Sequence, residues 1–413
     1  MKDVTRFTLS NGLRVVHHYN PGAAMAMVDV LYDVGSRDEH PDHTGMAHLF
    51  EHLMFGGSVN IADYDGELQR AGGMSNAWTS QDFTNFYDII PGRNIETALW
   101  LESDRMLSLA FSDKALQVQR SVVVEEFKQA CLNRPYGDME HHLKGLCYTV
   151  HPYRYPVIGK EFSHIEGVTQ DDVRAWFSSH YSPNNAILAA SCDIPAERFR
   201  RMVERWFGDI PSREIPSRDL PREPLPAAPR SLEVSGDVPQ TWITVAYPMA
   251  PYGVPAYFAA DLVSDVLSNG RSSRFYRELL APGKIFSDLD CSISGTEDPG
   301  LMLVSGRLLG CGPEAEREAV DAANREISRL VENGVGEELK RCLHRLESSR
   351  TFDMLGLMNR VQALALAEYH GEDLSTSFER NYLPLTADDI RRAAEEIFNP
   401  SKAMTLIYRP ANG

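Results

Sequence analysis

The chain has 413 residues, of which 43% are hydrophobic and 24% are charged, a composition ordinary for a globular protein. That length exceeds what one hydrophobic core usually serves, so two or more domains are expected. The net charge of −17 argues against binding to nucleic acid, which requires basic patches, and no apolar run approaches the ~20 residues that span a bilayer.

The first elements expected along the chain are strands. Residues 7–19, "FTLSNGLRVVHHY", are typical of a β-hairpin that turns at Asn11-Gly12, and residues 25–35 and 83–91 predict further strands. Because the chain enters strand-like sequence with no apolar leader, a cytoplasmic location is expected, or a periplasmic one if a leader has been removed.

Helical patterns follow at residues 93–109, 113–131 and 169–180, and the last of them begins an internal repeat. Residues 169–190 and 386–407 match at a constant offset of 217 (386 − 169). Each copy predicts a helix capped by a threonine, Thr169 or Thr386, then a turn at proline and a strand.

A proline-rich segment, residues 209–231, predicts an extended and stiff linker between the two halves. The expected organisation is a first domain over residues 1–208, this linker, and a homologous second domain over residues 232–413. The connections predict an α+β fold in which each domain is a mainly antiparallel sheet with helices packed on one face. Six scattered cysteines without a CxxC pair predict free thiols.

One short motif carries metal chemistry. Residues 45–55 predict a helix with Thr44 as its N-cap and Gly56 as its stop, and it contains "HLFEH" over residues 48–52. His48 and His52 are one turn apart on one face, so both imidazoles can reach one zinc ion, and Glu51 lies beside that face, where it can act as a general base.

The alternative is an amphipathic core helix whose histidines are incidental. The histidine distribution favours the metal site, because eleven of the thirteen histidines precede residue 181. The repeat offset carries His48 to Asp265 and His52 to Asn269, so the second half lacks the motif.

The order His-x-x-Glu-His is the inverse of the commoner zinc-protease motif. With "GSRDEHPDHTGMAHLFEHLMFGGS", "GGMSNAWTSQDFTNFYDIIP", "SVVVEEF", "HPYRYPVIG" and "YSPNNAIL", the sequence resembles the pitrilysin family of inverted zincins, most strongly over residues 1–200. The resemblance implies a zinc-dependent endopeptidase with one zinc ion per chain. It also implies a chamber enclosed by two such two-domain chains, which admits short or unfolded peptides.

The resemblance further implies a third ligand, a glutamate 70–80 residues after the motif, and both Glu125 and Glu126 qualify. On the helix over residues 113–131, Glu126 lies at the edge of the apolar stripe while Glu125 points away from it. Glu126 is therefore the predicted ligand. Gln119 lies within the stripe where the family usually has a supporting glutamate, and it is expected to orient the site by hydrogen bonding.

The family pattern also places substrate contacts. It makes residues 76–80, "NAWTS", an edge strand that pairs with the peptide backbone, with Asn76, Ala77 and Thr79 as the contacts. Trp78 is expected to be an ordinary strand residue.

A substrate-binding arginine and tyrosine that the family carries in its second half are replaced here by Leu280 and Ser287. A sister subunit that supplies the pair is therefore the expected partner, and a homodimer is the alternative assembly. The competing interpretation is a non-catalytic chain that binds peptides or scaffolds an assembly. A serine or cysteine hydrolase lacks support, because no G-x-S-x-G elbow is present.

Overall fold

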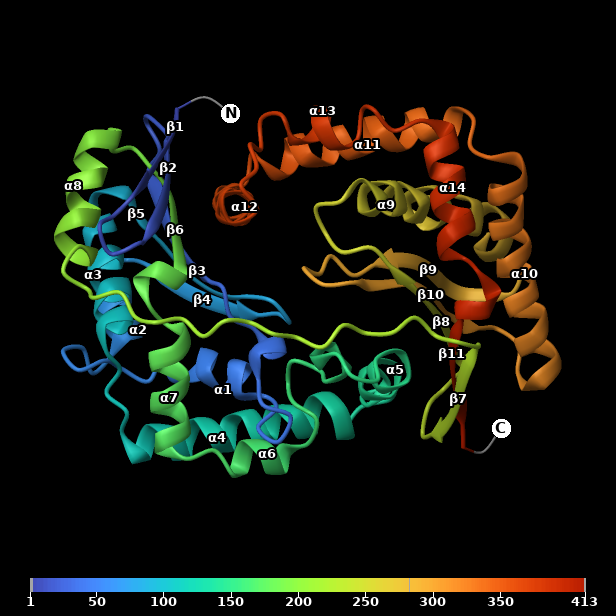
Figure 1. Ribbon diagram of the computed structural model, residues 1–413, viewed down its shortest axis with the longest axis horizontal. Helices are drawn as coiled ribbons and strands as arrows, with labels where there is room; N and C mark the ends of the chain where they lie inside the picture. The colour runs from blue at the N-terminus through green and yellow to red at the C-terminus, as the bar shows by residue number, and fades with distance from the viewer. Residues whose placement is uncertain (1–2, 282, 412–413) are drawn as a thin grey trace. The chain divides into compact units, whose positions relative to one another are not determined.

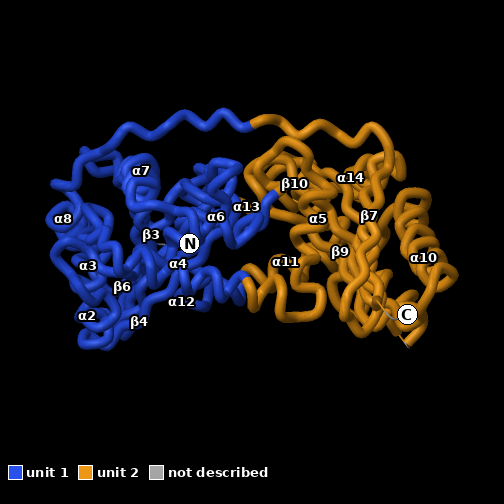
Figure 2. Tube along the Cα trace, turned by 90° about the horizontal axis from the view of Figure 1, so that it is seen from below, with its two compact units in different colours: residues 1–127, 155–220, 351–375 blue, residues 128–154, 221–350, 376–413 orange. Residues whose placement is uncertain are grey.

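The computed structural model describes residues 3–281 and 283–411, and none of its helices in those ranges is long and apolar enough to cross a membrane. The described chain forms two compact units, shown in different colours in Figure 2. Unit 1 contains residues up to 127 together with 155–220 and 351–375. Unit 2 contains residues 128–154, 221–350 and those from 376 onward.

Unit 1 is built on a six-stranded sheet with the strand order β1-β2-β6-β3-β5-β4. All neighbouring strands are antiparallel except β2 and β6, which are parallel. The strands are β1 (Val4–Thr8), β2 (Arg14–Tyr19), β3 (Met25–Tyr32), β4 (Met74–Thr79), β5 (Thr84–Pro91) and β6 (Ala186–Cys192). The helices are α1 (Met46–Leu53), α2 (Tyr64–Arg70), α3 (Ile95–Leu107), α4 (Asp113–Phe127), α6 (Phe162–Glu166), α7 (Gln170–His180), α8 (Ala196–Phe207) and α12 (Leu357–Tyr369) (Figure 1).

Unit 2 is built on a five-stranded sheet with the order β7-β11-β8-β10-β9, in which only β7 and β11 are parallel. Its strands are β7 (Arg230–Gly236), β8 (Trp242–Met249), β9 (Phe286–Ile293), β10 (Gly300–Leu308) and β11 (Met404–Pro410). Its helices are α5 (Met139–Cys147), α9 (Pro255–Ser268), α10 (Gly312–Asn333), most of α11 (Glu337–Asp353), α13 (Ser377–Asn381) and α14 (Ala387–Ile397). The α+β fold class is thus confirmed, and so is the mainly antiparallel pairing.

The two copies of the repeat have the same local structure. Thr169 caps α7 by accepting the N–H of Asp172, whose carboxylate in turn accepts the N–H of Thr169. Thr386 and Asp389 form the same reciprocal capping box on α14. Each helix leads into β6 or β11, which pairs in parallel with one strand of its sheet and antiparallel with another.

Each sheet buries both of its faces, and one face is covered by a segment from the other half of the sequence. In unit 1 the even-numbered side chains of β3 pack against α1, α3, α7 and α8, while Met27 and Leu31 pack on the opposite face against α12. In unit 2, α5 and the residues that follow it cover the face of the sheet opposite α9, α10 and α14.

The compact units therefore differ from the contiguous domains 1–208 and 232–413. The difference arises because residues 351–375 pack with the first sheet and residues 128–154 with the second. Helices cover one face of each sheet as expected, and these two segments add a cover on the other face.

The linker has neither helix nor strand between Phe207 and Arg230, and polar contacts hold it in place. In unit 1, Arg213 donates to the carbonyl of Tyr181 at 2.9 Å, and Arg218 donates to Asp38 at 2.6 Å. In unit 2, the carboxylate of Glu223 accepts the backbone N–H groups of residues 149–151 at 2.8–3.0 Å. These contacts fix both ends of the segment.

Candidate metal centre

Helix α1 places the two histidines of the motif. Its buried residues are Met46, Ala47, Leu49, Phe50 and Leu53, all in the main core of unit 1 or at its edge. This apolar face leaves His48, Glu51 and His52 on the partly exposed side of the helix.

The start of α1 differs from the sequence prediction. Gly45, not Thr44, is the N-cap, and its backbone has a φ of +88°, which favours glycine. A side chain here would also place its Cβ 2.9 Å from the carbonyl oxygen of Ile158. The hydroxyl of Thr44 instead accepts the N–H of Lys160 at 2.8 Å, so it is committed to another loop.

The free N–H groups of this helix start are satisfied by a buried carboxylate. Glu39 accepts the N–H of Gly45 at 2.9 Å and that of Ala47 at 2.8 Å. Sequence reasoning missed this residue because it lies six positions before the cap, outside the usual capping register. The only available signal was an acid shortly before the helix, and Thr44 already accounted for the cap in the sequence prediction.

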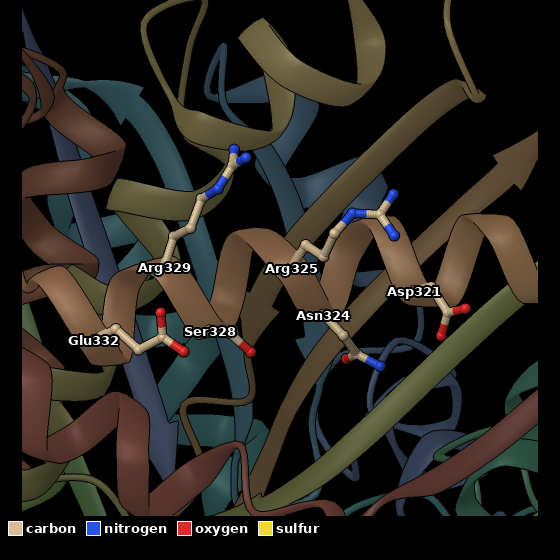
Figure 3. Close-up of a pocket in the computed structure, with 6 residues that line it drawn as sticks. All are labelled: Asp321, Asn324, Arg325, Ser328, Arg329 and Glu332. Carbon is tan, nitrogen blue, oxygen red and sulfur yellow. The ribbon is translucent and has the colours of Figure 1, made fainter.

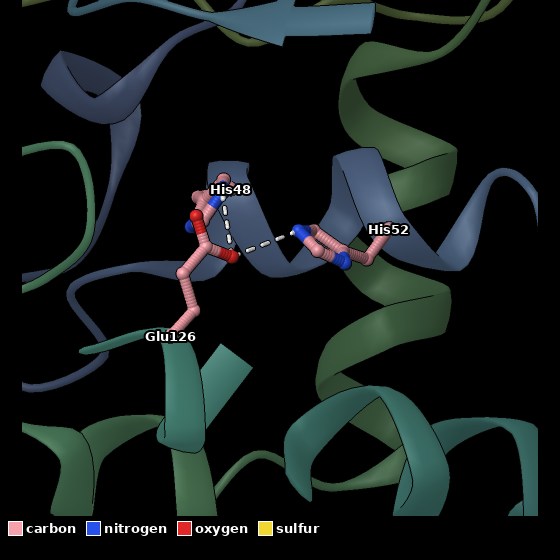
Figure 4. Close-up of side chains that lie close together, drawn as sticks. All are labelled: His48, His52 and Glu126. Carbon is pink, nitrogen blue, oxygen red and sulfur yellow. Dashed lines mark ion pairs between the residues drawn. The ribbon is translucent and has the colours of Figure 1, made fainter. Parts of the chain in front are cut away.

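His48, His52 and Glu126 converge on one point, as Figure 4 shows. The Nε2 atoms of His48 and His52 lie 3.8 Å and 3.5 Å from the same Glu126 oxygen, Oε2. Ligands held ~2.0–2.1 Å from a tetrahedral zinc ion are separated from one another by about 3.4 Å. The donor set and its spacing therefore fit zinc. Among the residues that the structure describes, no other group of three histidine, cysteine or acidic side chains meets this spacing.

Helix α4 carries Glu126 to this point. The helix is anchored by Leu116, Val123 and Phe127, which are buried, and by Arg120, which donates to the carbonyls of Glu166 and Val168 at 2.9 Å. The Glu126 side chain is the most exposed of the three, at 46% against 14% and 24% for the histidines. It therefore closes the cluster from the solvent side.

The charges of the cluster suit metal ligation. Burial lowers the pKa of His48 to about 4, so its imidazole is neutral near pH 7. The hydrogen bond from His52 holds the pKa of Glu126 below its usual range, so this carboxylate is ionised. Burial acts to lower the pKa of His52, but the hydrogen bond and charge of Glu126 outweigh it and raise that pKa. A cation binds the neutral imidazole, so the raised pKa of His52 makes a proton compete with the cation for this side chain.

Glu51 and Thr79 meet beside the cluster. The Thr79 hydroxyl donates to Oε2 of Glu51 at 2.6 Å, which ties α1 to the end of β4. Burial raises the pKa of Glu51, while the bond from Thr79 works in the opposite direction. A carboxylate with a raised pKa is a better proton acceptor at neutral pH.

The other expected residues lie around this centre. Gln119 shares a hydrogen bond with the imidazole of His52. Asn76 and Ala77 lie on β4, which is the edge strand of the unit 1 sheet, and the Asn76 side-chain oxygen accepts the Ala77 N–H at 2.8 Å. Trp78 packs on the opposite face of the sheet, in the cluster that includes α12.

Family comparisons agree with the two-part organisation. The model described as insulinase (peptidase family M16) matches residues 14–159, and the model described as the peptidase M16 inactive domain matches residues 167–344. The chain belongs to peptidase family M16. This confirms the resemblance to the pitrilysin family that the sequence motifs indicated.

Relatives of this M16 chain are zinc proteases or peptidases by name. It is 28% identical to the zinc protease PqqE of Helicobacter pylori over 98% of this chain and 92% of that protein. It is 27% identical to the β subunit of the mitochondrial-processing peptidase of Saccharomyces cerevisiae over 63% of this chain and 57% of that protein. A crystal structure of a protease from Helicobacter pylori superposes with a TM-score of 0.91 at 25% identity, covering 99% of this chain and 100% of the other.

The second half of the M16 chain carries other side chains at the two positions that the repeat matches to His48 and His52. It also carries other side chains at the two positions where the family pattern has an arginine and a tyrosine. Asp265 and Asn269, at the end of α9, hydrogen-bond to each other. Leu280 packs against the core of unit 2, and Ser287 lies exposed on β9, where its hydroxyl donates to the carbonyl of Arg307 at 3.3 Å. Both positions are thus occupied by residues with local structural contacts.

Unit 2 also has a surface hollow of about 470 Å³ on α10 (Figure 3). Its lining consists of exposed polar side chains from this one helix, namely Asp321, Asn324, Arg325, Ser328, Arg329 and Glu332. With no buried polar group directed into it, this hollow lacks the features of a binding site.

Proposed function

We propose that this M16 chain is a zinc-dependent endopeptidase for short or unfolded peptides. The observation that carries the proposal is the convergence of His48, His52 and Glu126 beside Glu51. Three protein ligands favour catalysis over a structural role, because structural zinc sites normally have four.

In this proposal His48, His52 and Glu126 hold one zinc ion, and Gln119 orients the imidazole of His52. Zinc supplies Lewis-acid activation of water and of the peptide carbonyl. Glu51 takes a proton from the attacking water and returns it to the leaving amine. The hydroxyl of Thr79 holds the Glu51 carboxylate in position for both transfers.

The free edge of β4 is the proposed docking strand. A peptide added there pairs with the backbone, so binding depends little on its sequence. Asn76, Ala77 and Thr79 are the proposed contacts. The side-chain oxygen of Asn76 accepts the N–H of Ala77, a local bond that a docking peptide would replace.

Because Leu280 and Ser287 replace the arginine and tyrosine of the family pattern, we propose that a sister subunit of different sequence supplies this pair. The same substitutions favour the second candidate function, a non-catalytic peptide-binding or scaffold chain. The loss of one donor to the transition state typically slows catalysis by about 10²–10³-fold. The turnover rate, measured with and without the partner, therefore distinguishes the two candidates.

The test is cleavage of an unstructured, internally quenched peptide by the zinc-loaded full chain, with Glu51→Gln as the blank. We expect about one zinc per chain in both proteins and a loss of at least about 10²-fold in kcat in the variant. Glu126→Gln should lose zinc, whereas the neighbouring Glu125→Gln should keep it.

Three results distinguish the candidates. Cleavage that the blank lacks supports an endopeptidase that acts alone. Bound zinc without cleavage, followed by activity once a chain bearing the arginine–tyrosine pair is added, supports the two-subunit enzyme. A chain that binds no zinc contradicts the catalytic proposal and leaves the scaffold function.

A further inference from the structure

A cavity of about 360 Å³ lies beside the edge strand of unit 1, and we refer to it as the β4 pocket. It is formed where α1 ends, where α2 passes, and where β4 begins. Its eight lining residues, all within the described chain, are Phe55, Asp65, Leu68, Gln69, Gly73, Met74, Ser75 and Asn76.

The strand and α2 approach closely because of Gly73. A Cβ on this residue would lie 2.7 Å from the Cδ1 atom of Leu68, so a larger side chain would push the two elements apart. Leu68 itself is buried, at 1% exposure, and with the partly buried Phe55 it gives the pocket an apolar floor.

The rim of the pocket is polar and carries one charge. Asp65 and Gln69 are exposed on α2, and the hydroxyl of Ser75 donates to Oδ1 of Asp65 at 2.9 Å. The lining includes no basic side chain. The bond from Ser75 fixes the orientation of the Asp65 carboxylate toward β4, so the pocket combines an apolar floor with a positioned anion.

The pocket is aligned with the candidate metal centre along two elements. Phe55 lies four residues after Glu51, just past the end of α1, and Ser75 precedes Thr79 by four residues on the same strand. Because side chains alternate along a strand, Ser75, Ala77 and Thr79 share the face of β4 that meets α1 and α2. A peptide paired with β4 would place one side chain near Glu51 and a side chain four residues away, on the same face, near the β4 pocket.

We propose that the β4 pocket is a side-chain subsite for lysine or arginine in the bound peptide, with Asp65 as the specificity-determining residue. Long basic side chains bury their methylene stems on apolar surface and keep the charge at the rim, which matches Leu68 and Phe55 below and Asp65 above. The inference rests on the proposed function, since it takes β4 as the docking strand.

The test is cleavage-site profiling of a peptide pool by the zinc-loaded full chain. Wild type should favour lysine and arginine at one position relative to the cleaved bond, by up to about five-fold, the range of a partly exposed ion pair. Asp65→Asn should lose this preference, and Asp65→Lys should favour glutamate there. Glu67→Gln, on the same helix but outside the pocket lining, is the matched control and should retain the wild-type profile.

Failure of the subsite and failure of the proposed function give different results. Cleavage with the same profile in wild type and Asp65→Asn overturns the subsite while the peptidase stands. If no peptide is cleaved, affinities of lysine, norleucine and glutamate peptides for the zinc-loaded chain are measured by fluorescence anisotropy. Lysine selectivity that Asp65→Asn removes then supports the subsite, and equal or undetectable binding overturns it.

Discussion

Glu39 links the backbone of the metal-bearing helix to the loop before it. Its carboxylate is buried and accepts two N–H groups at the start of α1, three residues or fewer from His48. Glu39→Ala leaves both donors unsatisfied and should lower the free energy of unfolding by about 2 kcal/mol. Because the helix start then loosens, zinc affinity should fall as well. Urea unfolding and competition with a chelator measure the two effects.

The control for Glu39 is Glu204→Ala, a substitution of an exposed glutamate on α8. Exposed positions of this kind usually change stability by less than about 0.5 kcal/mol. If Glu39→Ala is no more destabilising than Glu204→Ala, the capping role is contradicted.

His17 makes the free energy of unfolding depend on pH. It lies fully buried on β2, stacked on Phe199 at 4.3 Å, and burial, with a smaller effect of His18, lowers its pKa to about 4. The unfolded chain binds this proton near pH 6.5, so stability is complete above that pH and is lost as the pH falls toward 4. The loss between pH 7 and pH 5 should be about 2 kcal/mol.

Replacing this imidazole should flatten the pH profile. Urea unfolding of metal-free protein between pH 7 and pH 5 should show a smaller decrease for His17→Gln than for wild type. His40→Gln removes an exposed histidine and serves as the matched control. Equal slopes for all three proteins would contradict the role of His17.

Helix α12 stabilises the sheet that bears the metal centre, although it begins 278 residues after the end of β4 in the sequence (357 − 79). Leu364 is 1% exposed and packs in one cluster with Met27, Leu31 and Ile187. Leu364→Ala should destabilise unit 1 by about 2–5 kcal/mol, because it creates a cavity against the sheet. Amide hydrogen exchange should show faster opening of β3 and β6.

The matched control for α12 is Leu355→Ala, in the loop that precedes this helix. Leu355 is 71% exposed, so its removal should leave exchange in β3 unchanged. Similar exchange in both variants would show that α12 contributes no more than a solvent-exposed residue does.

Elements with local signals were predictable from the sequence. The hairpin at Asn11-Gly12 forms as expected, and the capping boxes of Thr169 and Thr386 form with both reciprocal bonds. These features depend on contacts within a few residues. The cover of the first sheet by α12 has no such signal, because its apolar side chains would equally suit packing on the second sheet.

The candidate site shows the same division between local and distant information. Helical spacing brings His48 and His52 onto one face, and the periodicity of α4 distinguishes Glu126 from Glu125. The role of Thr79 toward Glu51, and the cap supplied by Glu39, depend on how loops and strands meet in three dimensions. Spacing in the sequence carries no information on such meetings, so Thr44 was wrongly expected to cap α1.

The two units share the chain in an interleaved manner, which has a consequence for the molecule as a whole. Unit 1 contains residues 351–375 from the second half of the chain, and unit 2 contains residues 128–154 from the first half. A cut in the linker beside Leu225, which is 62% exposed, therefore breaks the chain without separating either hydrophobic core.

We expect a protein with a protease site inserted next to Leu225 to remain one particle after cleavage. Each fragment would have to expose the apolar faces of α12 or of the segment around Tyr148 and Tyr153 in order to leave, and burial of such faces contributes about 25 cal/mol per Å². Size-exclusion chromatography should give one native peak that contains both fragments, and two species only in denaturant. Two contiguous domains would instead separate on the native column, and that outcome would contradict the interleaved units.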